Sequence, residues 1–173
     1  MERDKLISRI KETSYLEGEF TLRSGKKSNY YLDKYLFETC PDILQALGEE
    51  FAKYTGDANL IAGAELGGVA LAAVTAIQTG KKWIIIRNSK KDYGTSKMIE
   101  GKLSKGDRVL LVEDIATTGG QVLEAAKIIT SQGGTVEKIV CVIDRRQGAR
   151  ENIEREGFEF ESILTKDELG IKD

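Results

Sequence analysis

The chain has 173 residues, with 26 lysines and arginines against 28 aspartates and glutamates, a formal net charge of -2, and no histidine. This balance provides no general basic field, so we expect neither a nucleic acid nor a membrane partner. The lack of histidine excludes Ser-His triads, histidine metal sites and imidazole acid-base catalysis. Because the length suits one well-filled core and no proline- or serine-rich linker divides it, we expect a single domain over residues 1–173.

The cysteines and the amino-terminal residues favour a reduced, intracellular setting. Cys40 and Cys141 stand far apart in unrelated contexts, so neither a disulfide framework nor a metal knuckle is indicated. The first residues, Met-Glu-Arg-Asp-Lys, lack the apolar segment of a signal peptide, and no apolar run approaches the roughly 18 residues needed to span a membrane. We therefore expect a soluble cytoplasmic protein.

The amino-terminal part of the chain has the pattern of a helix followed by a hairpin. Residues 3–16 carry apolar side chains at helical spacing among charges, which predicts a short amphipathic helix. Residues 18–25 and 26–33 have the pattern of two short strands joined by a Ser-Gly turn. A hairpin in this position predicts a flap in front of the main sheet.

From Pro41 onward, helical and strand patterns alternate. Helices are predicted from Pro41 to about Tyr54, from the Gly67-Gly68 pair to about Gln78, and over residues 122–130 and 149–156. Strands are predicted over residues 59–63, 82–87, 109–112, 136–143 and 158–164. This alternation predicts an α/β fold with an open, mostly parallel sheet flanked by helices.

The stretch Val109–Gln121 carries the strongest chemical signal. Four apolar residues end in Glu113 and Asp114, and a Thr-Thr-Gly-Gly loop then opens a helix, an order in which a ligand binds at the carboxyl end of the strand. The small residues of Thr117–Gly120 and the free N–H groups of the helix start form a phosphate cradle. The two acids suit neutral hydroxyls, such as a ribose diol, or a metal held through water. An ordinary strand-to-helix turn capped by the acids is the alternative reading.

The complete combination resembles the 5-phosphoribosyl 1-diphosphate binding motif of the type I phosphoribosyltransferases. Glu113, Asp114, Thr117, Thr118 and Gly119 fill the matching positions. The resemblance implies the fold of that family, with a small amino-terminal hood mainly within residues 1–40 and a core of about 41–165. The residues that it implies for the phosphoribosyl donor are Gly67, Gly68, Arg87, Lys91, Tyr93, Glu113, Asp114, Ile115, Ala116, Thr117, Thr118, Gly119, Gly120 and Gln121, with Lys91 and Asp114 as the catalytic pair.

A second resemblance concerns the base. Residues 20–33 are similar to the amino-terminal signature of the orotate phosphoribosyltransferases, which forms a hood over the pyrimidine. It implies that Tyr31 and Leu32 flank the base and that Arg23 stands where the family has lysine, whereas residue chemistry alone favours strand packing for the two tyrosines. The Asp-Arg-x-x-Gly-Ala-Arg run implies that Arg145 meets the orotate carboxylate, next to Thr117.

Residues 88–101 form a polar, lysine-containing stretch without a helical or strand period, which predicts a mobile loop. It resembles the catalytic loop of the orotate enzymes, and residues 88–100 would then be shared across the interface of a homodimer. Arg87 and Lys91 match the cations that bind pyrophosphate. The chain departs from the family at Asn88 and Tyr93, where a basic residue and a histidine are usual, and at Gly67, where some orotate enzymes carry lysine.

The resemblance implies a Mg²⁺-dependent transfer of the 5-phosphoribosyl group to orotate, which gives orotidine 5′-monophosphate and pyrophosphate in pyrimidine synthesis. This reaction needs no protein nucleophile, so the absence of histidine is no obstacle. We expect Mg²⁺ to be held mainly by substrate and water, with no direct protein ligand. Two alternatives remain: a phosphoribosyltransferase for another base, and a non-catalytic nucleotide-sensing regulator on the same fold.

Overall fold

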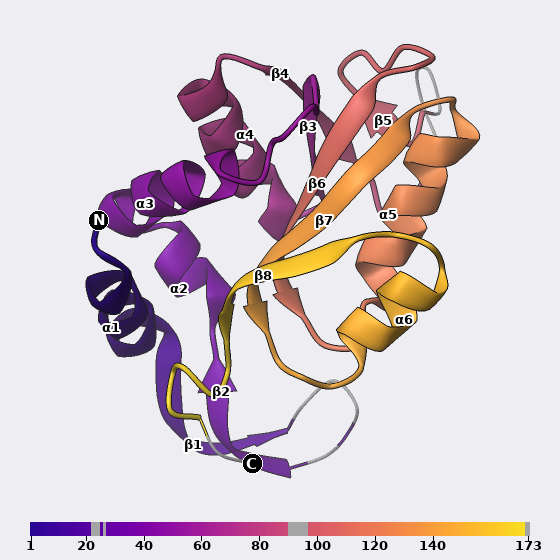
Figure 1. The fold of residues 1–173 in the computed structure, drawn as a ribbon. Coiled ribbons are helices and arrows are strands. Elements are labelled where there is room, and N and C mark those ends of the chain that lie inside the picture. The colour runs from indigo at the N-terminus through magenta and orange to yellow at the C-terminus, as the bar shows by residue number, and fades with distance from the viewer. Residues whose placement is uncertain (22–24, 26, 90–96, 172–173) are drawn as a thin grey trace.

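The structure is a computed structural model that describes residues 1–21, 25, 27–89 and 97–171. Its centre is a six-stranded sheet of order β5-β4-β3-β6-β7-β8, in which every pair is parallel except β4 with β5 (Figure 1). The strands are β3 (Leu60–Ala64), β4 (Lys82–Ile86), β5 (Ile99–Glu100), β6 (Arg108–Ala116), β7 (Thr135–Asp144) and β8 (Phe160–Thr165). The predicted open, mostly parallel α/β sheet is confirmed.

Helices cover both faces of this sheet (Figure 1). One face carries the first four helices, which are α1 (Arg3–Ser14), α2 (Lys34–Glu38), α3 (Pro41–Ala52) and α4 (Gly67–Thr79). The other face carries α5 (Gly120–Ser131) and α6 (Ala149–Arg155). No helix within the described ranges is both long and apolar enough to cross a membrane.

Strand β6 shows why its sequence is continuously apolar. Leu110 and Val112 pack with the helices of one face, while Val109 and Leu111 pack with those of the other. All four side chains are fully buried, because successive strand residues point to opposite faces and both faces are covered. The strand is thereby fixed on both sides, and its carboxyl end is held firmly at one edge of the sheet.

The hood is an antiparallel hairpin of β1 (Tyr15–Thr21) and β2 (Lys27–Leu32), with a register shift between Glu17 and Phe20. It lies at the end of the molecule toward which β6 and β7 point (Figure 1). The predicted helix over residues 3–16 is wrong at its end, since α1 stops at Ser14. Leu16 instead pairs with Tyr31 in the hairpin and is partly exposed, so its apolar side chain does not belong to the helix face.

Two elements were not predicted. Helix α2 has only five residues, too few for a helical period to be visible, and it begins where Asp33 accepts a hydrogen bond from the Tyr35 N–H. Strand β5 has two residues and adds to the sheet by pairing with Ile85 and Ile86, within a segment that was predicted to be a loop throughout. Residues 90–96 of that segment lie outside the described ranges.

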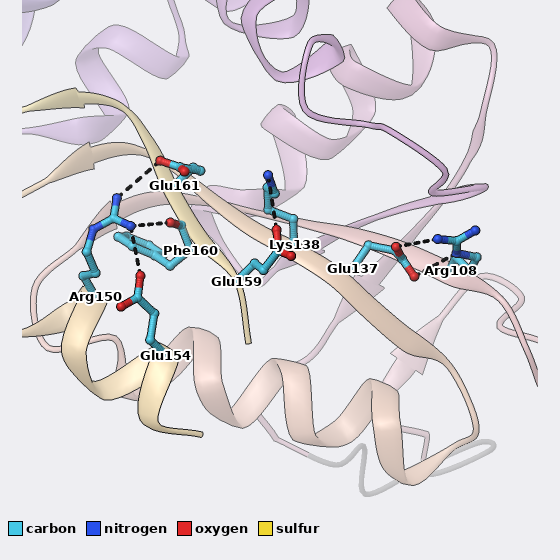
Figure 2. A network of polar contacts seen from close by, with 8 residues as sticks. All are labelled: Arg108, Glu137, Lys138, Arg150, Glu154, Glu159, Phe160 and Glu161. Carbon is cyan, nitrogen blue, oxygen red and sulfur yellow. Dashed lines mark hydrogen bonds and ion pairs between the residues drawn. The ribbon is translucent and has the colours of Figure 1, made fainter. Parts of the chain in front are cut away.

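Paired charges bridge β6, β7, β8 and α6 on the outside of the sheet, in a group that we term the outer ion-pair network (Figure 2). Arg108 donates two hydrogen bonds of 2.8 Å to the carboxylate of Glu137. Arg150 donates to the Phe160 carbonyl oxygen at 2.8 Å and forms ion pairs within α6 and with β8. The residues of the network are Arg108, Glu137, Lys138, Arg150, Glu154, Glu159, Phe160 and Glu161.

Candidate active site at the carboxyl ends of the strands

A pocket of about 210 Å³ opens at the carboxyl end of β6, between that strand, the start of α5 and helix α2. This is the edge at which parallel α/β sheets bind ligands. The residues that line it are Lys34, Glu113, Asp114, Ile115, Ala116, Thr117, Thr118, Gly119, Gly120, Gln121 and Val122. The structure therefore brings together all nine residues from Glu113 to Gln121 that were predicted to bind the phosphoribosyl donor.

The acid pair is buried at the base of the pocket, with 6 % of Glu113 and 2 % of Asp114 exposed. Glu113 accepts a hydrogen bond of 3.0 Å from the Asp114 N–H, and Asp114 Oδ1 accepts one from the Ile115 N–H. Burial, with the negative charge of Asp114 next to it, raises the pKa of Glu113 well above its usual value. The pair thus presents two adjacent carboxyl groups to a ligand, and burial disfavours the charged form of Glu113.

Lys34 is a site residue that was not predicted from the sequence. Its Nζ lies 2.6 Å from Asp114 Oδ2, although 80 positions separate the two residues. The side chain is 32 % exposed, so the ammonium group stands at the rim of the pocket. Burial acts to lower the pKa of Lys34, but the charge of Asp114 and the hydrogen bond to it outweigh burial and raise that pKa. The raised pKa favours the positively charged form of Lys34 beside the two acids.

Glu38, one helical turn after Lys34, is a second residue near the pocket that was not predicted. Only 4 % of the residue is exposed, and within the described part of the chain its Oε1 atom has no hydrogen-bond partner. Burial and the negative charge of Asp114 raise the pKa of Glu38 to about 8, although the positive charge of Lys34 opposes them. Glu38 is consequently protonated over most of the neutral range.

The glycines at the start of α4 are packed tightly within the protein. A Cβ atom at Gly67 would clash with Asp114 Oδ2, and one at Gly63 would clash with the carbonyl oxygen of Gly68. Only glycine fits such close contacts. Gly67 and Gly68 were predicted to allow a close approach of the backbone, and in the structure they approach other parts of the protein. A further contact of these two glycines with the phosphoribosyl donor stays a prediction.

The phosphate cradle takes its shape from Gly119, which has a φ of +79° and precedes the first residue of α5. This left-handed conformation favours glycine, and it turns the chain so that the free N–H groups of the helix start face the pocket. Asn152 of α6 donates a hydrogen bond of 2.9 Å to the Thr118 carbonyl oxygen and so fixes the loop from behind. The cradle is thus held in shape by contacts within the protein.

Gln121 connects three of the strand-end loops. Its Nε2 donates to the Glu65 carbonyl oxygen at 3.0 Å and to Asn88 Oδ1 at 3.3 Å, and the Asn88 N–H donates to Glu65 Oε2 at 3.1 Å. Asn88, which departs from the family pattern, is therefore part of a hydrogen-bonded support. The loops after β3 and β4 are held to the cradle by neutral groups.

Arg87 lies apart from the acid pair. It lines a smaller neighbouring pocket of about 50 Å³, to which Gln121 also contributes. Its Nη1 is 3.9 Å from a carboxylate oxygen of Glu65 and 3.9 Å from one of Glu100. The structure therefore places this predicted cation near the donor site but not in the same pocket, and its contact with pyrophosphate stays a prediction.

The hood meets the end of β7 through an arginine and a tyrosine. Arg145 donates a hydrogen bond of 3.0 Å to the Tyr30 hydroxyl, and Tyr30 in turn stacks on Tyr15 with ring centres 5.7 Å apart. Tyr31 is 44 % exposed, while Leu32 is packed in the core with 8 % exposed. Of the hood residues, it is thus Tyr30 that contacts the predicted carboxylate-binding arginine, and the roles of Tyr31 and Leu32 stay predictions.

Three predicted site residues, Arg23, Lys91 and Tyr93, lie outside the described residues. Within the described part, no group of three or more cysteine, aspartate and glutamate side chains has an arrangement that could hold a metal ion. Glu113 and Asp114 fit Mg²⁺ only as acceptors for its water shell, because burial disfavours the charged form of Glu113 and Asp114 is already bonded to Lys34.

Comparison with known proteins places this geometry in a family. The family model described as "Phosphoribosyl transferase domain" matches residues 37–167. The chain therefore belongs to the phosphoribosyltransferase family, whose fold it shares.

Individual relatives and solved structures indicate which phosphoribosyltransferases this chain resembles. The chain is 46 % identical over 169 residues to the orotate phosphoribosyltransferase of Methanocaldococcus jannaschii, covering 96 % of each chain. A crystal structure of the orotate phosphoribosyltransferase of Mycobacterium tuberculosis H37Rv has a TM-score of 0.88 at 32 % identity and covers 98 % of this chain and 99 % of its own. The same enzyme in complex with 5-phospho-alpha-D-ribosyl 1-diphosphate has a TM-score of 0.84 at 30 % identity, covering 98 % and 99 %. Within its family the chain groups with the orotate phosphoribosyltransferases, which are pentosyltransferase enzymes.

Proposed function

We propose that this chain transfers the 5-phosphoribosyl group from 5-phosphoribosyl 1-diphosphate to orotate, giving orotidine 5′-monophosphate and pyrophosphate. The observation that carries the proposal is the buried pair Glu113 and Asp114 directly beside the preformed cradle Thr117–Gly120. A diol acceptor next to a phosphate cradle matches ribose 5-phosphate. The relatives that match over nearly the full chain are named orotate phosphoribosyltransferases, which is the name of this reaction.

The residues at the end of β6 would orient the donor. The cradle would bind the 5-phosphate through N–H groups and threonine hydroxyls, while Glu113 and Asp114 accept hydrogen bonds from the ribose hydroxyls. Loss of pyrophosphate leaves positive charge on the ribose ring, and the ionised Asp114 lies where it can stabilise that charge. Arg87 and Lys91 would stabilise the negative charge of the leaving pyrophosphate.

The base would be held where the hood meets β7. Arg145 is directed toward the hood by Tyr30, and a guanidinium group matches a carboxylate with two parallel hydrogen bonds. Arg23, Tyr31 and Leu32 of the hood and Thr117 of the cradle complete the predicted base contacts. The ring nitrogen of bound orotate is already anionic or nearly so. It can therefore react without a general base from the protein.

We further infer Mg²⁺ as the cofactor, a C2 homodimer as the assembly and the cytoplasm as the location. Mg²⁺ prefers to keep several waters and to bind substrate phosphates, where it neutralises charge on the diphosphate. A dimer would let residues 88–100 of one subunit, with Lys91, complete the site of the other. Both cysteines are free, which suits a reducing compartment.

The test follows orotate by its ultraviolet absorbance in the presence of 5-phosphoribosyl 1-diphosphate and Mg²⁺. We expect turnover by the wild type and a loss of about 10²-fold or more in Lys91→Ala, with orotate strongly preferred in a panel that includes adenine, guanine and uracil. Turnover of another base alone would favour the second phosphoribosyltransferase hypothesis. A folded wild type that binds the donor without turnover of any base would contradict the proposal and favour a regulator.

A further inference from the structure

Lys34 and Asp114 form a contact that a bound donor has to change. Asp114 Oδ2 is occupied by the Lys34 ammonium group at 2.6 Å, and Asp114 Oδ1 is occupied by the Ile115 N–H. Both oxygens of the acid are therefore already engaged by groups of the protein. A ribose hydroxyl that binds Asp114 Oδ2 has to share that atom with Lys34 or displace it.

Of the two partners, Lys34 is the one that can move. Asp114 is buried, and Gly67 lies so close to its Oδ2 atom that even a methyl group would not fit between them. Lys34 is one third exposed and stands on the short helix α2, with a flexible four-carbon side chain. The acid is thus fixed by packing, while the ammonium group is free to turn within the pocket mouth.

The direction of that movement follows from the surroundings. Among the described residues that line the pocket, Lys34 is the single basic one, and the cradle Thr117–Gly120 binds the 5-phosphate through neutral groups. Asp114 Oδ2 faces the loop that begins α4 at Gly67, which is the side on which the diphosphate is expected. An ammonium group that leaves Asp114 on that side meets the most highly charged part of the donor.

Glu38 lies where it could otherwise hold Lys34 back. It stands four residues after Lys34 on α2, a spacing that brings two side chains to the same face of a helix. Because it is buried and protonated near neutral pH, it adds no second negative charge to compete for the ammonium group. Among the described residues, the ion pair that Lys34 has to leave is the one with Asp114.

We propose that Lys34 is a donor-binding residue that exchanges partners: its ammonium group contacts Asp114 in this structure and moves to the diphosphate oxygens when 5-phosphoribosyl 1-diphosphate binds. Asp114 Oδ2 is thereby released to the ribose hydroxyl. Lys34 is in this way a selector for donors that carry a diphosphate at C1. The inference rests on the proposed function of the pocket, and it assigns a role to a residue outside the recognised motif.

The test compares two ligands that differ only in the diphosphate. Binding of 5-phosphoribosyl 1-diphosphate and of ribose 5-phosphate is measured by calorimetry in Mg²⁺ buffer for the wild type, Lys34→Met and Lys34→Arg. We expect Lys34→Met to weaken binding of the diphosphate donor by about tenfold or more, the loss of one charge-assisted hydrogen bond, and to leave ribose 5-phosphate unchanged or tighter. Lys34→Arg is expected to recover most of the donor affinity.

Lys53→Met is the matched control, since Lys53 is 64 % exposed at the end of α3 and pairs with Glu50 outside the pocket. It should bind both ligands as the wild type does. Equal weakening of both ligands in Lys34→Met would show that Lys34 only holds Asp114 in place, and unchanged donor affinity would show no role; either result overturns the inference. A wild type that binds neither ligand would instead contradict the proposed function itself.

Discussion

Two groups of charged residues in this molecule are built in opposite ways. In the outer ion-pair network each described charge faces an opposite charge at the surface, as for Arg108 with Glu137 (Figure 2). At the ligand end of β6 four ionisable side chains, Lys34, Glu38, Glu113 and Asp114, are collected with three acids to one base and are mostly buried. Each acid of the first group has a basic partner, whereas in the second group three acids share the single base Lys34.

The difference shows what each group is for. Exposed ion pairs contribute little to folding, because water screens them, and they need no ligand. Buried acids without enough partners raise the free energy of the folded state, and they persist where a ligand supplies the missing hydrogen bonds and charge. The raised pKa values of Glu38 and Glu113 are the direct sign of this deficit. Glu113 lines the pocket that we assign to the phosphoribosyl donor, and Glu38 stands one helical turn from Lys34, which also lines it.

The largest effect is expected within the acid pair itself. Asp114→Asn should lower kcat/KM for orotate and donor by about 10²-fold or more, because it removes the ionised group that faces the ribose. Glu113→Gln should cost far less, since the raised pKa of Glu113 already disfavours its charged form and the amide oxygen can still accept the Asp114 N–H. Steady-state kinetics of the two isosteric variants measures the contrast, and equal losses would show that both acids act as anions.

Glu38 gives the next largest effect, on stability. The folded state keeps a proton on Glu38 up to about pH 8, whereas the unfolded state releases it near the usual value of 4.5. Wild-type stability should therefore fall as pH rises through that window. In Glu38→Gln this dependence is lost, so the Tm of the variant relative to the wild type should rise by several degrees between pH 4.5 and pH 8.

Circular dichroism melts over that pH range decide the point for Glu38. The offset between the two proteins at any one pH is not diagnostic, because the glutamine amide also needs a hydrogen-bond partner in the buried site. The change of the offset with pH is diagnostic, since other groups such as Glu113 titrate alike in both proteins. Melting curves that stay parallel from pH 4.5 to pH 8 would show that Glu38 is ionised normally.

Arg108→Gln in the outer ion-pair network is expected to have the smallest effect. The side chain is 46 % exposed, so solvent screens its pairs with Glu137 and Asp57. We expect a change in Tm of no more than about 2 °C and kcat/KM within about twofold of the wild type. Thermal melts and steady-state kinetics measure the two quantities. A larger loss of kcat/KM would mean that the network positions the site through β6.

The sequence predicts local features well in this protein and distant pairings poorly. The order of strand, acids, loop and helix around residues 109–121 could be read because each part has its own pattern over neighbouring positions. The contact between Lys34 and Asp114 could not be read, since it joins residues 80 positions apart and one of them lies on a five-residue helix without a visible period. Lys34 is consequently absent from the predicted site.

The hood shows the same limit at finer scale. The hairpin was predicted, but strand alternation decides which tyrosine faces inward, and the register follows from a shift between Glu17 and Phe20 that no short pattern indicates. The structure directs Tyr30 to Arg145 and leaves Tyr31 exposed. Arg145 itself was predicted, because the Asp-Arg-x-x-Gly-Ala-Arg run in which it stands resembles a segment of the orotate phosphoribosyltransferases.

The most direct test of the contrast between the two groups is a paired measurement of donor affinity and Tm on Asp114→Asn and Arg108→Gln. We predict that Asp114→Asn loses affinity for 5-phosphoribosyl 1-diphosphate by about tenfold or more while its Tm is maintained or rises, since a buried charge is removed. Arg108→Gln should keep the affinity. If Asp114→Asn bound the donor like the wild type, or lost affinity only through a large fall in Tm, the buried acids would be structural and the site would lie elsewhere.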